Sequence, residues 1–574
     1  MPKLAAVFAA SLVLLAGCAS QGALTDYTVN SGAQRSPDQR ALAFEHADLT
    51  LRIDPASQSL RGDALLTFGT RAPLDRIELD LDRNLSIDAV AVDGRPLAAD
   101  RFRNPDGKLT IDLPQRLEPG RRTTVRVTYH GTPHVAKRAP WDGGFVWART
   151  PDGQPWVASA VQGEGCDLFW PCIDHPTGKP QSVDEHIVVP APLVAAGNGV
   201  ARGMTEADGW RTWHWHAAHP STYGIAVNVG PYALLESEYL SRYGNVIPLR
   251  LWYLPQNKAQ AQDLFAEFAP MLDFFESTIG PYPFGAEKMG VVETPYKGME
   301  HQTINAYGNR YARTAYGYDD LLQHEFAHEW FGNQLTNADW DDMWLHEGLG
   351  TYMQPLYMQY LHGDQEYFAT LMQQRAGIRN KAPLVSGRHK REEDVYDVKR
   401  GGPGGDIYVK GSLVLHTLRG LIGDAAFFRA VRELVYGTPD PRPGNVAPRY
   451  ATTPEFIAIA ERASGRSLDW FFQAYMYQAG LPELTVARHG DTLDLAWRTA
   501  ARTPFPMPLE VRVGTGPDAR VVTLPMADGR GSLALPAGAT YTLDPRSKIL
   551  RREERFEVYQ RYQERQQKDA KTGS

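Results

Sequence analysis

The sequence predicts a multidomain α+β protein, and three observations indicate this fold class. First, its 574 residues exceed the size of one ordinary domain. Second, apolar and polar residues alternate along many short runs before about residue 236, as in β-strands. Third, apolar residues then recur at helical intervals until about residue 480, after which alternation returns.

The composition is that of a globular protein able to bury large cores. Hydrophobic residues make up 43% of the chain and charged residues 22%. The formal net charge is −7, and both signs are interspersed without a basic block. This charge pattern excludes a dedicated nucleic-acid-binding protein.

The N-terminus has the pattern of an export signal. Lys3 precedes a small and apolar run that is too short to span a bilayer, which predicts a signal peptide over 1–18. The end of that run, LAGC, resembles a bacterial lipobox and implies a lipid anchor on Cys18 that holds the protein at a membrane. We therefore expect an exported protein of the bacterial cell envelope, facing the periplasm. Plain secretion without lipid is the alternative.

Five further segments follow the signal. Residues 19–43 are polar and predict a tether, and residues 44–236 predict an N-terminal all-β domain, with runs such as ADLTLRID and TTVRVTYHG. Residues 237–480 predict a helix-rich domain that contains NKAQAQDLFAEFAPMLDFFESTIG. Residues 481–546 predict a small β domain, and 547–574 a charged helical tail. Cys166 and Cys172 are the two cysteines beyond the signal, and their spacing leaves a disulfide between them open.

The stretch LLQHEFAHEWFGNQLT carries the pattern of a metal site. In a helix, residues four apart share one face, so His324 and His328 can direct two imidazoles at one ion. Glu325 follows the first histidine and lies beside that ion. The alternative is a helix whose polar residues are simply solvated.

A third ligand is expected because a catalytic zinc commonly has three protein ligands and one open position. Glu347 follows His328 by nineteen residues, which leaves room for a loop and the start of a second helix. His346 competes for this role, but neighbouring helical residues point about 100° apart, so only one of the two can face the ion. The sequence predicts one Zn²⁺ per chain, bound by His324, His328 and Glu347.

The combination HEFAHEWFGN and WLHEG resembles the aminopeptidase N family of gluzincin zinc peptidases. The resemblance extends from the β-first, helix-second order of the chain to SLDWFFQAYMYQAGLPEL at 467–484. It implies a saddle-like N-terminal β domain and a thermolysin-like, mainly helical catalytic domain. The chain resembles a short form of the family, without the helical superhelix found at the C-terminus of many members.

The resemblance also implies residue roles. Glu325 would be the general base, and Tyr408, in DIYVKGS, would stabilise the oxyanion. YKGMEHQT resembles the family's Gly-x-Met-Glu-Asn motif and VQGEG its Gln-x-Glu segment. They imply substrate binding by the residues Glu164, Glu300, Gly298 and Met299, with the two glutamates holding the free α-ammonium.

Three positions depart from the family pattern. Lys297 replaces the first Gly of the motif, His301 its final Asn, and His346 the Asn before the third ligand. We expect these changes to alter the shape and charge around the amine subsite while leaving the zinc ligands in place.

The predicted function is a zinc aminopeptidase acting on peptides with a free N-terminus. A thermolysin-like endopeptidase would share the ligands but has no use for Glu164 and Glu300. A catalytically inactive binding protein on the same fold is a further alternative, although such a protein would be expected to lose ligands or the base. An epoxide hydrolase, also represented in the family, has no specific support in the sequence.

Overall fold

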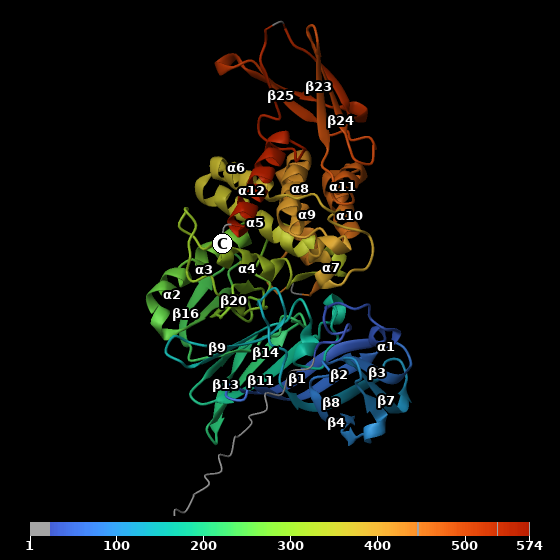
Figure 1. Ribbon diagram of the computed structural model, residues 1–574, viewed down its shortest axis with the longest axis vertical. Helices are drawn as coiled ribbons and strands as arrows, with labels where there is room; N and C mark the ends of the chain where they lie inside the picture. The colour runs from blue at the N-terminus through green and yellow to red at the C-terminus, as the bar shows by residue number, and fades with distance from the viewer. Residues whose placement is uncertain (1–22, 445–446, 537, 573–574) are drawn as a thin grey trace, which may run out of the picture.

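Three regions follow one another along the long axis of the molecule (Figure 1). The computed structural model describes residues 23–444, 447–536 and 538–572. An N-terminal β region lies at one end, a helical block in the middle and a small β region at the other end. This arrangement confirms the predicted multidomain α+β fold class. The predicted signal peptide and Cys18 lie outside the described residues.

The N-terminal region is built on an eight-stranded sheet of order β13-β14-β11-β1-β2-β8-β4-β5. Alternate residues of β1, such as Leu49, Leu51 and Ile53, are buried, as the sequence pattern predicts. The strands are β1 (Leu42–Asp54), β2 (Ser59–Thr70), β4 (Ser86–Val92), β5 (Arg95–Pro96), β8 (Arg122–Gly131), β11 (Ser182–Pro190), β13 (Val200–Ala207) and β14 (Trp210–Ala218).

Two smaller sheets complete this region. One has the order β3-β7-β6 and the other β12-β15-β10-β9. Their strands are β3 (Leu74–Asp80), β6 (Phe102–Arg103), β7 (Lys108–Leu117), β9 (Gly144–Arg149), β10 (Pro155–Ala160), β12 (Val194–Ala196) and β15 (Asn228–Gly230).

Residues 23–41, the described part of the chain before β1, pack against the protein, whereas we expected a polar tether over 19–43. Their polar side chains find partners inside the fold: Tyr27 donates a hydrogen bond to Asp80 (2.5 Å), and Gln39 donates to the same carboxylate (2.9 Å). Arg391 also donates to backbone carbonyls of this segment. A short helix, α1 (Pro37–Arg40), leads into β1.

The middle block contains a five-stranded sheet of order β16-β17-β18-β20-β19 beside its helices. The sequence predicted only a helix-rich block here. The parallel strands β18 and β20 are buried along their whole length, so they do not show the alternation that marks a half-exposed strand. The strands are β16 (Ala233–Leu240), β17 (Val246–Tyr253), β18 (Met289–Glu293), β19 (Gly298–Met299) and β20 (Asn305–Tyr307).

The helices of the middle block pack beside this sheet (Figure 1). The run at 257–280 forms two helices, because the chain turns at Ala266 and Glu267. The helices are α2 (Lys258–Phe265), α3 (Phe268–Thr278), α4 (Asp320–Trp330), α5 (Trp344–His362), α6 (Asp364–Gly377), α7 (Glu392–Tyr396), α8 (Asp406–Ile422), α9 (Asp424–Tyr436), α10 (Thr453–Ser464) and α11 (Asp469–Tyr475), with a two-stranded ribbon of β21 (Leu335–Asn337) and β22 (Arg449–Ala451).

The C-terminal region has two three-stranded sheets and a final helix that returns along the middle block (Figure 1). That helix contacts α6, and Glu553, the residue just before it, pairs with Arg375 of α6 at 2.6 Å. No helix within the described ranges is long and apolar enough to cross a bilayer. The elements are β23 (Glu483–His489), β24 (Thr492–Arg498), β25 (Leu509–Val513), β26 (Arg520–Leu524), β27 (Arg530–Ala534), β28 (Tyr541–Leu543) and α12 (Glu554–Thr572).

Candidate metal centre and substrate cavity

Helix α4 carries two of the predicted ligands and is anchored at both ends. Asp319 caps its N-terminus by accepting a hydrogen bond from the Leu322 N–H at 3.0 Å. Near its C-terminus, Glu329 accepts hydrogen bonds from the Thr303 N–H (2.8 Å) and from Asn305 of β20 (3.0 Å). These bonds hold the helix against the sheet and orient the face that carries the histidines.

The three predicted ligands meet at one point between α4 and α5. The Nε2 atoms of His324 and His328 are 3.1 Å apart. Glu347 Oε2, from the first turn of α5, lies 3.5 Å from the first of them and 3.6 Å from the second. The spacing argument for Glu347 as third ligand therefore agrees with the geometry.

This donor set fits a zinc ion. Glu347 Oε2 is buried and accepts no hydrogen bond from the described residues, so it is free to bind a cation. His328 Nδ1 is 2.9 Å from the Phe331 carbonyl, and an N–H donated there leaves Nε2 as a lone-pair donor toward the metal position. Two imidazoles and one carboxylate are a common protein ligand set of catalytic zinc sites.

Glu325 lies beside the ligands and is almost completely buried. Its carboxylate, that of Glu300 and the imidazole of His328 offer ligand atoms within 4.8 Å of one another. Burial raises the pKa of Glu325 well above its ordinary value, and the nearby charges of Glu300 and Glu347 raise it further.

Tyr408 reaches the same centre from α8. Its hydroxyl oxygen is 3.2 Å from that of Tyr396, and its ring lies 6.2 Å from the His324 ring. Burial raises the pKa of Tyr408 well above its ordinary value, and the charge of Glu347 adds to this effect. The phenol therefore keeps its proton and can act as a hydrogen-bond donor.

Glu300 is held by two donors from the N-terminal region. Gln162 donates to its Oε1 at 2.8 Å, and Tyr223 donates to the same oxygen at 3.0 Å. The side chain is 3% exposed. Since both bonds use Oε1, the other carboxylate oxygen remains available to a ligand.

Glu164 lies on the same segment as Gln162, and one of its oxygens accepts a hydrogen bond from the Gly143 N–H. Its neighbours Gln162 and Gly163 line the central cavity, whereas the Glu164 side chain does not. A disulfide joins Cys166 to Cys172 just beyond this residue. The question left open by the cysteine spacing is thus answered, and the bridge closes the loop next to Glu164.

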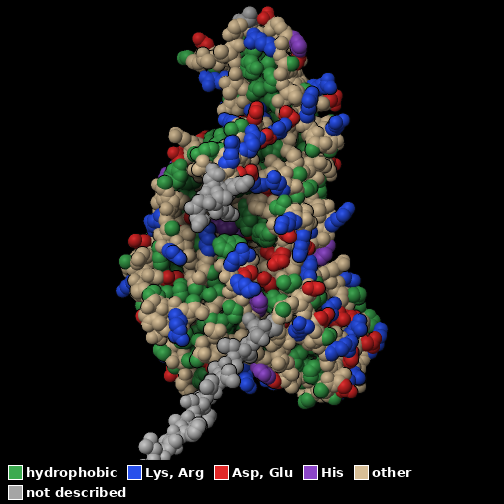
Figure 2. All heavy atoms as spheres, viewed as in Figure 1, with side chains coloured by type: hydrophobic (Ala, Val, Ile, Leu, Met, Phe, Trp, Pro, Cys, Tyr) green, Lys and Arg blue, Asp and Glu red, His purple; other side chains and the backbone are tan. Residues whose placement is uncertain are grey.

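The three ligands, Glu325, Glu300 and Tyr408 border one cavity of about 570 Å³. Gly298 and Met299, which form the edge strand β19, line it together with the ligands, Glu300 and Tyr408. The same wall contains Glu392, Glu393 and Asp397, while Lys297 is the one lysine or arginine among the described residues that line it. Figure 2 shows acidic side chains gathered on one face where the helical block meets the N-terminal β region.

Two of the three departures from the family pattern leave the charge of the site unchanged. His301 is fully buried, which lowers its pKa to about 3 and keeps it neutral. His346 is also buried and neutral, and its Nε2 accepts a hydrogen bond from the Asn337 N–H at 3.0 Å. In this neutral state the two histidines add no charge to the site. Lys297, which is exposed and lines the cavity, is the departure that adds charge.

Sequence reasoning missed Tyr223, which donates to Glu300, and several residues that line the cavity, among them Tyr396, Glu392, Glu393 and Asp397. Glu392 to Asp397 lie in REEDVYD, which reads as a short, solvated, charged helix. No motif marks it, and only the packing of α7 against the N-terminal segment brings it to the cavity. The Glu392 N–H, for example, donates to the Ser31 carbonyl at 3.0 Å.

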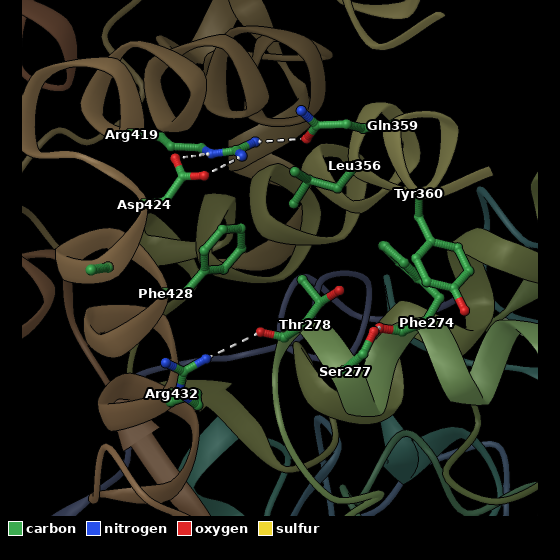
Figure 3. Close-up of a pocket in the computed structure, with 11 residues that line it drawn as sticks. Phe274, Ser277, Thr278, Leu356, Gln359, Tyr360, Arg419, Asp424, Phe428 and Arg432 are labelled. Carbon is green, nitrogen blue, oxygen red and sulfur yellow. Dashed lines mark hydrogen bonds and ion pairs between the residues drawn. The ribbon is translucent and has the colours of Figure 1, made fainter. Parts of the chain in front are cut away.

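A second cavity, of about 410 Å³, lies between α3, α5, α8 and α9 (Figure 3). The two arginines that line this second cavity already have partners. Arg419 forms two 2.8 Å hydrogen bonds with Asp424 and one with Gln359, and Arg432 donates to the Thr278 carbonyl. None of the three ligands or Glu325 borders this cavity, so we assign the chemistry to the first one.

Comparisons with known proteins agree with this geometry. Residues 268–475 match the Peptidase family M1 domain, and residues 43–223 match the Peptidase M1 N-terminal domain. An M1 zinc metallopeptidase from Deinococcus radiodurans, solved as a mutant bound to a Tyr-Ser-Ala substrate, superposes with a TM-score of 0.64. It is 26% identical, and the match covers 79% of this chain and 98% of that one.

Two curated relatives are named as aminopeptidases. Leucine aminopeptidase 2 of Aspergillus niger is 26% identical over 71% of this chain, and aminopeptidase N of Haemonchus contortus is 26% identical over 78% of it. The chain spans 66% of the length of the first and 48% of the second.

Proposed function

Because the chain belongs to peptidase family M1, we propose that it is a zinc aminopeptidase that hydrolyses the first peptide bond of peptides with a free N-terminus. One observation carries the proposal. The buried carboxylate of Glu300 lies within 4.8 Å of both Glu325 and His328, next to the metal ligands. An amine held there would place the first peptide bond at the metal centre.

We propose one zinc ion per chain, bound by His324 Nε2, His328 Nε2 and Glu347 Oε2. When bound, zinc would polarise the scissile carbonyl and lower the pKa of a water molecule at the site. The protein's part is to fix the three donors, which it does through the cap of α4 and the bond between His328 and Phe331.

Glu325 and Tyr408 supply the acid–base and electrostatic parts of the reaction. The Glu325 carboxylate accepts the proton of the attacking water and later delivers it to the leaving amine. The Tyr408 hydroxyl donates a hydrogen bond to the oxyanion that develops on the former carbonyl oxygen. Both groups are held in a largely buried site, where such interactions are stronger than in water.

Glu300 and Glu164 make the enzyme an exopeptidase. The oxygen of Glu300 that Gln162 and Tyr223 leave free would accept a hydrogen bond from the α-ammonium. Glu164, two residues from Gln162, would add to the attraction in its ionised form, although burial raises its pKa to about 8. Gly298 and Met299 of β19 would contact the substrate main chain beside the ligands. A thermolysin-like endopeptidase has no use for this carboxylate pair.

The test compares matched peptides that differ only in N-terminal acetylation, with product mapping by mass spectrometry. We expect single residues to be released from the free peptide and kcat/KM to fall tenfold to over a hundredfold for the acetylated one. The reason is that a charge-assisted contact in a desolvated site contributes about 1.5–3 kcal/mol. Efficient internal cleavage of the acetylated peptide would favour the endopeptidase, and zinc binding without any hydrolysis would favour an inactive binding protein.

We also propose that the protein is exported and held at the bacterial envelope by lipid on Cys18, facing the periplasm. The support is the LAGC pattern at the end of an apolar signal. In a Cys18→Ser variant the protein should move from the membrane fraction to the soluble fraction. Unchanged membrane association of that variant would exclude Cys18 as the anchor.

A further inference from the structure

Glu392 is a buried carboxylate on the wall of the catalytic cavity that the proposed reaction does not use. It begins α7 and is 4% exposed. Its backbone N–H is bonded to the Ser31 carbonyl, which fixes its place. Across the described ranges of the chain, its carboxylate receives neither a hydrogen bond nor an ion pair.

The Glu392 carboxylate lies beside the segment that faces the α-amine. Its Oε2 would be 3.5 Å from a β-carbon on Gly163. On one side of that glycine, Gln162 bonds to Glu300, and on the other side is Glu164. Glu392 therefore adjoins the two proposed amine anchors and is not part of the zinc ligand set.

A buried carboxylate without a partner needs a cation. Burial raises the pKa of Glu392 well above its ordinary value, and the charges of Glu164, Glu393 and Glu300 raise it further. The free α-ammonium brings one positive charge, for which Glu300 is already placed on the cavity wall. A second positive charge on the same ligand would give the Glu392 carboxylate a partner.

The neighbouring acids are less suited to this task. Asp397 accepts a hydrogen bond from the Lys399 N–H at 2.8 Å and lies 3.5 Å from the Arg400 guanidinium. Glu393 is more exposed than Glu392, so water screens its charge. Trp141, which is 69% exposed and lines the cavity, offers a flat surface for the stem of a long cationic side chain.

We propose that Glu392 binds the positively charged side chain of the first substrate residue, so that the enzyme prefers peptides beginning with Arg or Lys. The inference rests on the proposed aminopeptidase function and names the substrate class of that same cavity. A guanidinium or ammonium would form a charge-assisted contact with the carboxylate, whereas a neutral side chain of equal size would leave it unpaired.

The test uses pairs of aminoacyl amides of nearly equal shape: Arg against citrulline and Lys against norleucine. For the unmodified enzyme, kcat/KM should favour the cationic member of each pair by about tenfold to a hundredfold. In Glu392→Gln the ratio should fall toward one, while kcat/KM for citrulline amide changes by less than about threefold. Glu393→Gln is the matched control and should retain the preference.

Three results would overturn the inference: equal rates for both members of each pair in the unmodified enzyme, a preference that survives in Glu392→Gln, or an equal loss for both members in that variant. Calorimetric binding of L-arginine and L-citrulline to the metal-free protein separates this inference from the proposed function. Tighter arginine binding that Glu392→Gln abolishes would support the subsite even if no amide were hydrolysed. Hydrolysis with a ratio of one would leave the aminopeptidase and reject the subsite.

Discussion

Gly411 of α8 lies so close to Gly348 of α5 that a β-carbon on Gly411 would come within 2.9 Å of the Gly348 Cα. The two helices can approach this closely because neither residue has a side chain at the contact. Glu347 precedes one of these glycines, and Tyr408 lies one turn before the other. The helix contact therefore sets the distance between a proposed zinc ligand and the proposed oxyanion donor.

Gly411→Ala should damage catalysis through this contact. The added methyl meets backbone atoms, so the helices must separate, and we expect a loss of about 1–3 kcal/mol in the free energy of unfolding together with a lower kcat. Gly420→Ala on the same helix is the control, because its methyl would meet only the Lys548 side chain, at 3.4 Å. Urea denaturation and steady-state kinetics are the measurements. A fully active, equally stable Gly411→Ala would contradict the role of the contact.

His328→Ala should abolish tight metal binding. The substitution removes one of the three donors and leaves Glu347 Oε2 with a single imidazole nearby. We expect zinc in the purified protein to fall from about one equivalent to near zero, with a lower melting temperature because bound metal no longer stabilises the fold. His362→Ala, at the exposed end of α5, should retain the metal. A full equivalent of zinc in His328→Ala would disprove the ligand assignment.

The variant Glu325→Gln should lose the general base and keep the zinc ligands. The amide has nearly the same shape but cannot accept the water proton, so kcat should fall by roughly a hundredfold or more while zinc content stays unchanged. Asp320→Asn, which changes an exposed acid on the same helix, should remain active. Near-normal turnover of zinc-loaded Glu325→Gln would assign the proton to another group.

Tyr408→Phe should lower kcat with little change in KM. The phenol acts on the oxyanion, which exists only in the transition state, and one such donor contributes roughly a hundredfold to a thousandfold. Tyr396→Phe removes the hydroxyl that lies 3.2 Å from it and should have a smaller effect. If Tyr408→Phe raised KM alone, the hydroxyl would be binding the ground state instead.

The burial of Lys179 should make the free energy of unfolding depend on pH. Its ammonium is buried and donates to the Asn333 carbonyl at 2.7 Å, and burial lowers its pKa from an ordinary 10.5 to about 7. Between these values the unfolded chain holds the proton and the folded chain does not, so this group makes the free energy of unfolding rise with pH. Below about pH 7 both states are protonated and the penalty is complete.

The free energy of unfolding of Lys179→Met should therefore exceed that of the unmodified protein most at pH 7. This difference should shrink toward pH 10, by at most about 1.4 kcal/mol per pH unit. Urea denaturation at both pH values measures the difference, and the exposed Lys381→Met serves as the control. A gain that is the same at pH 7 and pH 10 would show that the buried ammonium is not the cause.

The zinc ligands could be predicted because metal-binding residue types occur at short, characteristic spacings in the sequence. Two histidines four apart on a helix must share a face, and Glu347 lies where a second helix can begin. Tyr408 and Glu300 needed a family resemblance, since a single tyrosine or glutamate carries no spacing signal. The structure brings both to the ligands, and their roles stay predictions.

Glu392 and Tyr223 could not be predicted from local pattern. They approach the cavity from α7 and from the N-terminal region, and only long-range packing brings them to Glu164 and Glu300. The neutral state of His301 was also beyond the sequence, because it depends on complete burial and not on residue type. The sheet inside the helical block was missed for a related reason, since strands buried on both faces lose the alternation by which strands are recognised.

The two-residue strand β19 ends its sheet with a partner on one side only. An open strand edge invites pairing with strands of other molecules and is a common origin of aggregation. Here the edge is very short and opens into the cavity, since Gly298 and Met299 both line it. A folded copy of the protein is too large to bring a strand into a space of about 570 Å³, whereas a slender unfolded chain end can enter. The position of this edge thus shields β19 from pairing with a strand of another folded copy.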